Sequence, residues 1–223
     1  IDIGVVSPYD IRCKCNKAAW RFNHAIRCYS YPGEENRKCT FYIYSRSPIV
    51  ECYQNDKLIK RSKINPKKSF IKFNGKYIPG TLKAVAKDLK GNILGEVSLK
   101  TASEDIKLRY YKEEYPEADR FAYVHFAFED EEGNRNVHQE KNIEISDVKG
   151  GKLLRLGNSA SYNKVGYLTN KIKTYHAKGM GIFEFDEDSK EIIFSITSEL
   201  GQETITIKRW SFVTKSGQWR PLL

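Results

Sequence analysis

The chain has 223 residues, of which 40% are hydrophobic, so it can bury the core of one large domain or of two small ones. No apolar run approaches the length of a membrane span, which excludes a membrane helix and predicts a soluble protein without a membrane partner. The formal charge of +10 is uneven, because residues 1–103 hold 20 Lys and Arg against 8 Asp and Glu, whereas residues 104–223 hold 18 against 20. This shift predicts a domain boundary near Ser103.

The first residues favour extended structure. Alternating apolar residues over 3–15 indicate an opening strand-like segment, and Trp20 and Phe22 are spaced to share one strand face. No stretch of the first half has a convincing helical period. The sequence opens on Ile1 without an initiator Met, so we expect a piece of a longer protein. Any targeting signal is expected to lie upstream or not to exist.

The segment 31–61 has the clearest strand pattern of the chain. Apolar and more polar side chains alternate from Lys38 to Tyr44, the period of two that places one face of a strand against a core. A second β-rich run covers 49–53, and Asn55-Asp56 then supplies two residues that tolerate positive φ before the next strand. The segment is therefore predicted to be an antiparallel meander.

Further short strands follow the meander. One begins at Phe70 and is predicted to end at Asn74-Gly75, and the runs 81–88 and 93–101 are joined by the turn LKGN. Short strands at roughly eight- to twelve-residue spacing, joined by Gly, Pro and Asn turns, are typical of a β-sandwich.

The second half has the same style. The run 121–128 is apolar on both faces, as expected at a sandwich centre, and EDEEGN at 129–134 predicts a turn. Residues 159–178 are polar and long for a plain loop, a place where lids, binding loops or insertions tend to lie. Three strands are predicted to complete the sheets, at 180–185, 191–197 and 203–208.

All five cysteines lie in the first half, and they have neither an even count nor the spacing of a zinc site. They are Cys13, Cys15, Cys28, Cys39 and Cys52. We expect reduced, mostly buried thiols and no metal or other cofactor. Unpaired, reduced cysteines favour a cytoplasmic protein, although the compartment stays open.

With these turns in place, the sequence resembles the C-terminal all-β region of bacterial glycoside hydrolase family 2 enzymes, the β-galactosidase-like group. The similar features of the first half are YPGEEN at 31–36, IVECYQNDKLIKR at 49–61 and IPGTLKAVAKDLKGNILGEVSLKTAS at 78–103. Those of the second half are FAYVHFAFEDEEGN at 121–134, GGKLLRLGN at 150–158 and MGIFEF at 180–185.

Two departures from the family pattern accompany this resemblance. The usual Asn-Gly hairpin is Asn55-Asp56 here, which still permits a tight turn, and the tryptophan-rich stretch before the Pro-Gly turn is NHAIRCYSYPG, with tyrosines in place of indoles. The resemblance implies immunoglobulin-like sandwiches that follow a catalytic TIM barrel in the parent chain.

Catalytic chemistry is not expected in this chain. A retaining glycosidase needs two carboxyl groups about 5 Å apart on rigid strand ends, whereas the acidic clusters here lie in turns, where solvated loops are the usual case. No alternation of strands and helices indicates a barrel, no GxSxG occurs, and the four histidines are scattered. We therefore assign no catalytic residue and no metal ligand.

Two binding hypotheses remain open. Aromatic side chains that point away from the core could stack on a sugar ring, and the candidates for carbohydrate contact are Trp20, Tyr29, Tyr31, Tyr42 and Tyr44. The basic first half could instead neutralise phosphates, through Lys57, Lys60, Arg61, Lys63, Lys67, Lys68 and Lys72. Nucleic acid is the weaker hypothesis, because no RNA-binding motif accompanies the charge.

The sequence thus predicts an all-β chain of two immunoglobulin-like antiparallel β-sandwich domains, at 1–103 and 104–209, with a C-terminal tail at 210–223. The predicted function is accessory, in support of the catalytic barrel of a β-galactosidase-like enzyme that hydrolyses glycosidic bonds. The alternative is an independent carbohydrate-binding module. An oligosaccharide partner and an oligomer stay open.

Overall fold

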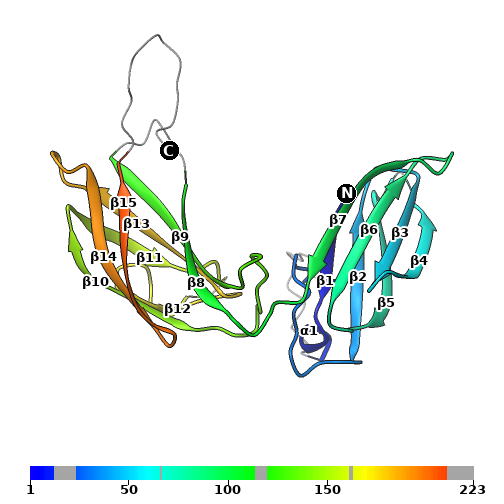
Figure 1. The fold of residues 1–223 in the computed structure, drawn as a ribbon, viewed down its shortest axis with the longest axis horizontal. Helices are drawn as coiled ribbons and strands as arrows, with labels where there is room; N and C mark the ends of the chain where they lie inside the picture. Colours follow the sequence, from blue (N-terminus) through cyan, green and yellow to red (C-terminus); the bar gives the residue numbers. More distant parts are fainter. Residues whose placement is uncertain (13–23, 66, 114–119, 161–162, 210–223) are drawn as a thin grey trace, which may run out of the picture. The chain divides into compact units, whose positions relative to one another are not determined.

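A computed structural model describes residues 1–12, 24–65, 67–113, 120–160 and 163–209. They form almost only antiparallel strands, gathered into four open sheets that make two β-sandwiches (Figure 1). The predicted all-β fold is confirmed. Among the described residues, no helix is both long and apolar enough to cross a membrane.

Contacts divide the chain into two compact units. Unit 1 comprises residues 1–106 and 129–138, and unit 2 comprises residues 107–128 together with the residues from 139 onward. The decapeptide 129–138, which contains the predicted EDEEGN turn, therefore packs with the first sandwich although it follows a strand of the second.

The described residues of unit 1 form seven strands in two sheets. One sheet has the order β1-β2-β5, formed by Asp2–Val6, Lys38–Tyr44 and Phe70–Lys76. The other has the order β4-β3-β6-β7, formed by Lys57–Lys63, Ile49–Gln54, Thr81–Lys87 and Ile93–Lys100. The order is that of an immunoglobulin-like sandwich in which the fourth strand pairs with the third.

The predicted alternation in β2 is confirmed in the core of unit 1. Cys39, Phe41 and Ile43 are fully buried between the sheets, together with residues such as Val50 and Leu82 from the opposite sheet. The tight turn before β4 is also confirmed, since Asn55 and Asp56 have φ of 48° and 63°.

Two local predictions in unit 1 were wrong. Residues 8–12 form a short helix, α1 (Pro8–Arg12), because Ser7 caps it: the Ser7 Oγ accepts from the Asp10 backbone N at 2.9 Å and donates to the Asp10 carboxylate at 2.6 Å. Asn74 and Gly75 continue β5 instead of turning. A Cβ at Gly75 would lie 2.6 Å from the Phe41 ring, so glycine lets the core ring pack against the strand.

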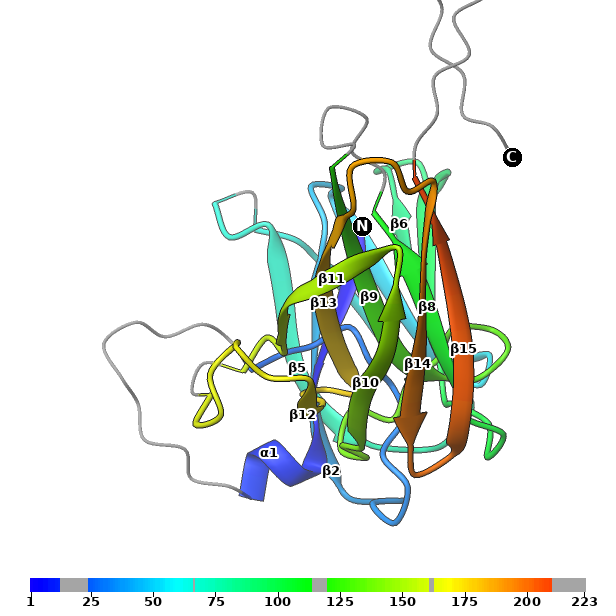
Figure 2. The ribbon, with the colours of Figure 1, turned by 90° about the vertical axis from the view of Figure 1, so that its left-hand side faces the viewer.

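In the described part of unit 2, eight strands form two sheets, whose faces are seen in Figure 2. One sheet has the order β8-β9-β13-β11, formed by Lys107–Lys112, Phe121–Glu129, Lys178–Phe185 and Gly151–Gly157. The other has the order β12-β10-β14-β15, formed by Lys171–Lys173, Asn142–Lys149, Glu191–Ser198 and Gly201–Lys208. Without the short β12, this is the strand order of an immunoglobulin constant-type domain.

Aromatic rings fill the core of unit 2. Phe183 and Phe194 stack with ring centroids 4.6 Å apart, and Phe126 meets Phe194 edge-on at 6.3 Å. These rings come from both sheets, so they join the two layers of the sandwich.

Candidate functional site

Two of the predicted sugar-contacting tyrosines are core residues. Tyr29 and Tyr31 are each 1% exposed, and both pack edge-on against Tyr77 with ring centroids 5.2 Å apart. Their hydroxyls donate to the backbone carbonyls of Ile78 and Cys28, and burial raises the pKa of Tyr29 to about 12. Neither ring face is open to solvent, because both side chains lie in the core of unit 1.

The other two described candidates lie together on the outer face of unit 1. Tyr42 and Tyr44 stack with an interplanar angle of 14°, and Phe70 packs against both rings at about 6 Å. The Lys72 ammonium lies 5.4 Å from the Tyr42 ring centroid. Only Tyr44 is partly exposed, because its neighbours cover Tyr42 to 9% exposure. The fifth candidate, Trp20, lies outside the described residues.

Part of the basic charge of unit 1 lies on an edge strand and beside one buried acid. Lys57, Lys60 and Lys63 belong to β4, an edge strand, where lysines prevent edge-to-edge pairing. Arg61 instead pairs with Glu51 of β3, with 3.4 Å between Arg61 Nε and the carboxylate. This arrangement gives much of the basic charge a structural role, while a nucleic-acid partner stays a prediction.

Glu51 is the centre of a polar cluster on the outer face of β3. Its carboxylate is 2.6 Å from the Lys87 ammonium and accepts a 2.6 Å hydrogen bond from the Tyr53 hydroxyl. The bond from Lys87, followed by that from Tyr53, lowers the pKa of Glu51 despite its burial.

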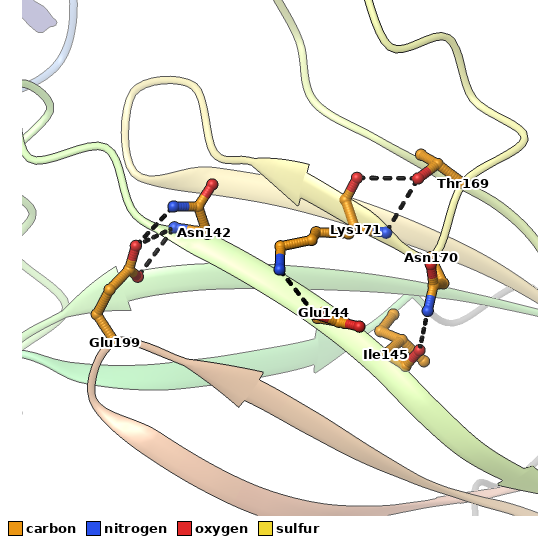
Figure 3. A network of polar contacts seen from close by, with 7 residues as sticks. All are labelled: Asn142, Glu144, Ile145, Thr169, Asn170, Lys171 and Glu199. Atoms are coloured by element: carbon orange, nitrogen blue, oxygen red, sulfur yellow. Dashed lines mark hydrogen bonds and ion pairs between the residues drawn. The ribbon is translucent and has the colours of Figure 1, made fainter.

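A second polar network joins β10, β12 and the end of β14 in unit 2 (Figure 3). The Glu199 carboxylate accepts from the Asn142 backbone N at 2.9 Å and from its side-chain amide at 2.8 Å. Lys171 Nζ donates to Glu144 at 2.9 Å, and the Asn170 amide donates to the Ile145 carbonyl at 3.1 Å. The bonds of Lys171 and Asn170 fix β12 to β10, so part of the predicted long loop 159–178 is a paired edge strand.

The carboxylates with perturbed pKa values are held ionised. Burial raises the pKa of Glu199 and of Asp130, but hydrogen bonds outweigh it and lower both values. The donors are Asn142 for Glu199, and Ser103 and Asn134 for Asp130. The ion pair with Lys152 lowers the pKa of Glu184. A glycosidase acid needs the opposite, a raised pKa that keeps its proton at working pH. These carboxylates are built as hydrogen-bond acceptors.

The described cysteines are buried thiols without disulfides, at Cys28, Cys39 and Cys52. Burial raises the pKa of Cys39 and of Cys52 to about 12. Cys13 and Cys15 lie outside the described residues. Within the part of the chain that the structure describes, no cluster of His, Cys, Asp and Glu could hold a metal ion.

Sequence reasoning missed a hollow of unit 2. A cavity of about 600 Å³ lies against β9, β11 and β13, and its lining includes His125, Arg155, Tyr167 and Met180. The length of the segment 159–178 was the one signal for it, and that segment contributes Ser159, Tyr167 and Lys178 to the lining. Most of the other lining residues lie on the outward faces of β9, β11 and β13, which no local sequence motif brings together.

Both units are thus immunoglobulin-like sandwich modules, and similar tandem modules occur in solved glycoside hydrolases. A glycosyl hydrolase family 2 member from Bacteroides cellulosilyticus matches 93% of this chain with a TM-score of 0.80 at 23% sequence identity. A β-glucuronidase from glycoside hydrolase family 2 matches 84% with a TM-score of 0.72 at 17% identity, and a β-glycosidase from Bacteroides vulgatus matches 82% with a TM-score of 0.69 at 16% identity.

The chain has the fold of one part of these enzymes, and the resemblance to family 2 glycoside hydrolases suggested by the sequence is confirmed at the level of the fold. It spans only 28%, 20% and 24% of the three chains, respectively. No protein-family model matches the sequence, and no curated protein matches it.

Proposed function

We propose that the chain forms the non-catalytic, C-terminal accessory sandwiches of a family 2 glycoside hydrolase of the β-galactosidase-like group. The observation that carries this proposal is the match of both units, over 93% of the chain, to 28% of a family 2 enzyme. The remainder of such an enzyme would supply the barrel and its two carboxyl groups. In this role the sandwiches brace the barrel and do no chemistry alone.

Four carboxylates fit a structural role. Glu51, Asp130, Glu184 and Glu199 have lowered pKa values and accept hydrogen bonds. The β-galactosidase assignment is finer and rests on the sequence motifs at 31–36, 49–61 and 78–103.

The test compares the purified chain with the full parent enzyme on nitrophenyl β-galactoside, β-glucuronide and β-glucoside. We expect no turnover by the chain alone and fastest hydrolysis of the galactoside by the parent. Turnover by the chain alone would overturn the accessory role, whereas a parent that prefers glucuronide would overturn only the galactosidase assignment. Adding the chain to a parent lacking it should raise the thermal midpoint of the barrel.

The alternative, an independent carbohydrate-binding module on unit 1, is favoured by the stacked pair of Tyr42 and Tyr44 on the outer face of β2. It predicts that the isolated chain is retained on immobilised polysaccharide and that Tyr44→Ala, with or without Tyr42→Ala, shortens the retention. Unchanged retention in both variants would end this alternative.

A further inference from the structure

The hollow of unit 2 is built on two cross-strand rows of the sheet β8-β9-β13-β11. His125 of β9 lies opposite Met180 of β13, which lies opposite Gly157 of β11. The next row contains Ile182, which lies opposite Arg155 of β11. Directly opposed residues point to the same face of a sheet, so these side chains share the outer face, away from the phenylalanine core.

Gly157 gives the hollow its shape. A Cβ at this position would lie 2.5 Å from Cδ1 of Tyr167, so only glycine lets the Tyr167 ring lie directly on β11. The ring forms a wall of the hollow and remains 52% exposed. Met180 and Ile182, both half-buried, line the hollow beside it.

The segment that carries Tyr167 is fixed at several points. The Tyr167 carbonyl accepts from the Leu156 backbone N at 3.1 Å, and the Asn158 side-chain amide donates to the Lys173 carbonyl at 2.7 Å. Further along, β12 pairs with β10 through the network of Figure 3. The aromatic wall is therefore positioned before any ligand arrives, which lowers the entropy cost of binding.

The polar groups of the hollow are cationic or neutral. Arg155 and Lys178 line it, and no Asp or Glu is found among its described lining residues. The Arg155 guanidinium donates to the Leu154 carbonyl at 2.6 Å, which uses only one of its five N–H donors. His125 also lines the hollow and donates from Nε2 to Glu113, which fixes the imidazole ring.

We propose that this hollow is a binding site for an acidic saccharide, a short glycan whose sugar carries a carboxylate or sulfate group. The apolar C–H face of the sugar ring stacks on Tyr167 and rests against Met180, while the acidic group accepts bidentate hydrogen bonds from Arg155. The inference goes beyond the accessory role, because it rests on the geometry of unit 2 alone.

Size and chemistry favour a small saccharide over a protein partner. A volume of about 600 Å³ falls within the roughly 300–1,000 Å³ of small-molecule sites, which combine apolar walls with a few convergent polar groups. The cations at the rim select for a negative charge, and the guanidinium fork matches a planar carboxylate. Sulfate also satisfies such a fork, so the source of the charge is settled by experiment.

The experiment titrates the full chain with matched disaccharides by isothermal calorimetry, with amide NMR shifts as the positional readout. The probes are cellobiuronic acid, cellobiose 6′-sulfate and cellobiose, which share a backbone and differ at one carbon. We expect at least one acidic probe to bind roughly tenfold or more tightly than cellobiose. The amides of Gly157 and Gly179 should shift on binding.

Three variants and one control variant assign the contacts. Tyr167→Ala should weaken the binding of every probe by roughly three- to tenfold, whereas Tyr111→Ala, on β8 and similarly exposed at 51%, should change nothing. Arg155→Ala should make the acidic probes bind no better than cellobiose. Gly157→Ala, which displaces the Tyr167 ring without removing it, should weaken binding even if Tyr167→Ala folds poorly.

Several outcomes would overturn the proposal. Absence of binding by all three probes rejects the saccharide site, and equal binding of cellobiose and the acidic probes rejects the acidic class. Shifts confined to residues of unit 1 would place any binding elsewhere. Because none of these results depends on a catalytic barrel, they leave the accessory role untouched.

Discussion

The clearest stability prediction concerns Glu51→Ala. The Glu51 side chain is 5% exposed, and its carboxylate meets Lys87 and Tyr53 at 2.6 Å each, with Arg61 at 3.4 Å. Hydrogen bonds to a charged group contribute about 1.5–3 kcal/mol each, and breaking a buried ion pair leaves its partner uncompensated. Because Lys87 is itself 22% exposed, water recovers part of this loss. We expect unit 1 to lose about 2–4 kcal/mol of unfolding free energy at pH 7.

The matched control is Glu96→Ala. Glu96 lies in the same cross-strand row, since Glu51 is opposite Val85 and Val85 is opposite Glu96, but its side chain is exposed. Removing it should change the free energy by less than about 0.5 kcal/mol. The assay is urea unfolding followed by near-ultraviolet circular dichroism, where the buried tyrosines of unit 1 report the loss of packing.

The stabilisation by Glu51 depends on pH, and the direction of its pKa shift sets the sign of this dependence. The pKa of Glu51 is lowered in the folded protein, so its stabilisation is fully present above the unfolded value of about 4.3 and is lost as pH falls through the folded value. The difference between wild type and Glu51→Ala should therefore shrink at pH 3. A Glu51→Ala cost no larger than that of Glu96→Ala, or a difference independent of pH, would refute the reasoning.

Three further predictions concern glycine, acid and thiol chemistry. Gly150→Ala should cost about 1–3 kcal/mol more unfolding free energy than Gly166→Ala, as measured by urea unfolding. The two glycines have similar φ, +73° at Gly150 and +74° at Gly166, but only at Gly150 would a Cβ lie 2.2 Å from the Glu191 carbonyl oxygen. Equal costs would contradict this prediction. Asp130→Ala should cost about 2–3 kcal/mol of unfolding free energy at pH 7 and less at pH 3. Burial raises the pKa of the Asp130 carboxylate, but hydrogen bonds from the backbone N–H groups of Ser103 and Asn134 outweigh it and lower the pKa. A larger cost in acid would contradict this prediction. Cys39, with its pKa raised to about 12, should resist iodoacetamide at pH 8 until urea unfolds unit 1, and peptide mapping of a modified native Cys39 would disprove this.

Strand positions could be predicted wherever one strand face is buried. The alternation in 38–44 and the Asn55-Asp56 turn give local signals that packing then reinforces, so both survive in the structure. The wrong predictions occur where a local sequence signal was not used, or where a residue far away in the sequence determines the local structure. The sequence SPYD before residue 11 is a capping signal that was readable, whereas Gly75 continues a strand because of Phe41, which lies more than thirty residues earlier.

The sugar-contact hypothesis shows the corresponding limit for sites. Tyr29 and Tyr42 are indistinguishable by residue type, yet one anchors the core through its hydroxyl and the other lies on the outer face. A tyrosine satisfies either role, because its ring is apolar and its hydroxyl needs only one partner. Which role it takes depends on the sheet that covers it, and that is a property of topology.

Two strand glycines, Gly157 and Gly75, show how a backbone position can determine where an aromatic ring lies. Gly157 admits the Tyr167 ring onto β11 and keeps it half-exposed, whereas Gly75 admits the Phe41 ring into the core. Both are strand glycines that accommodate an aromatic ring, and the difference is whether the ring comes from the neighbouring strand of the same sheet, as Phe41 does, or from a surface segment, as Tyr167 does. In this chain, Gly157 and Tyr167 together hold a ring on the outside of the sandwich. Such a ring is available to a ligand without unfolding any part of the core.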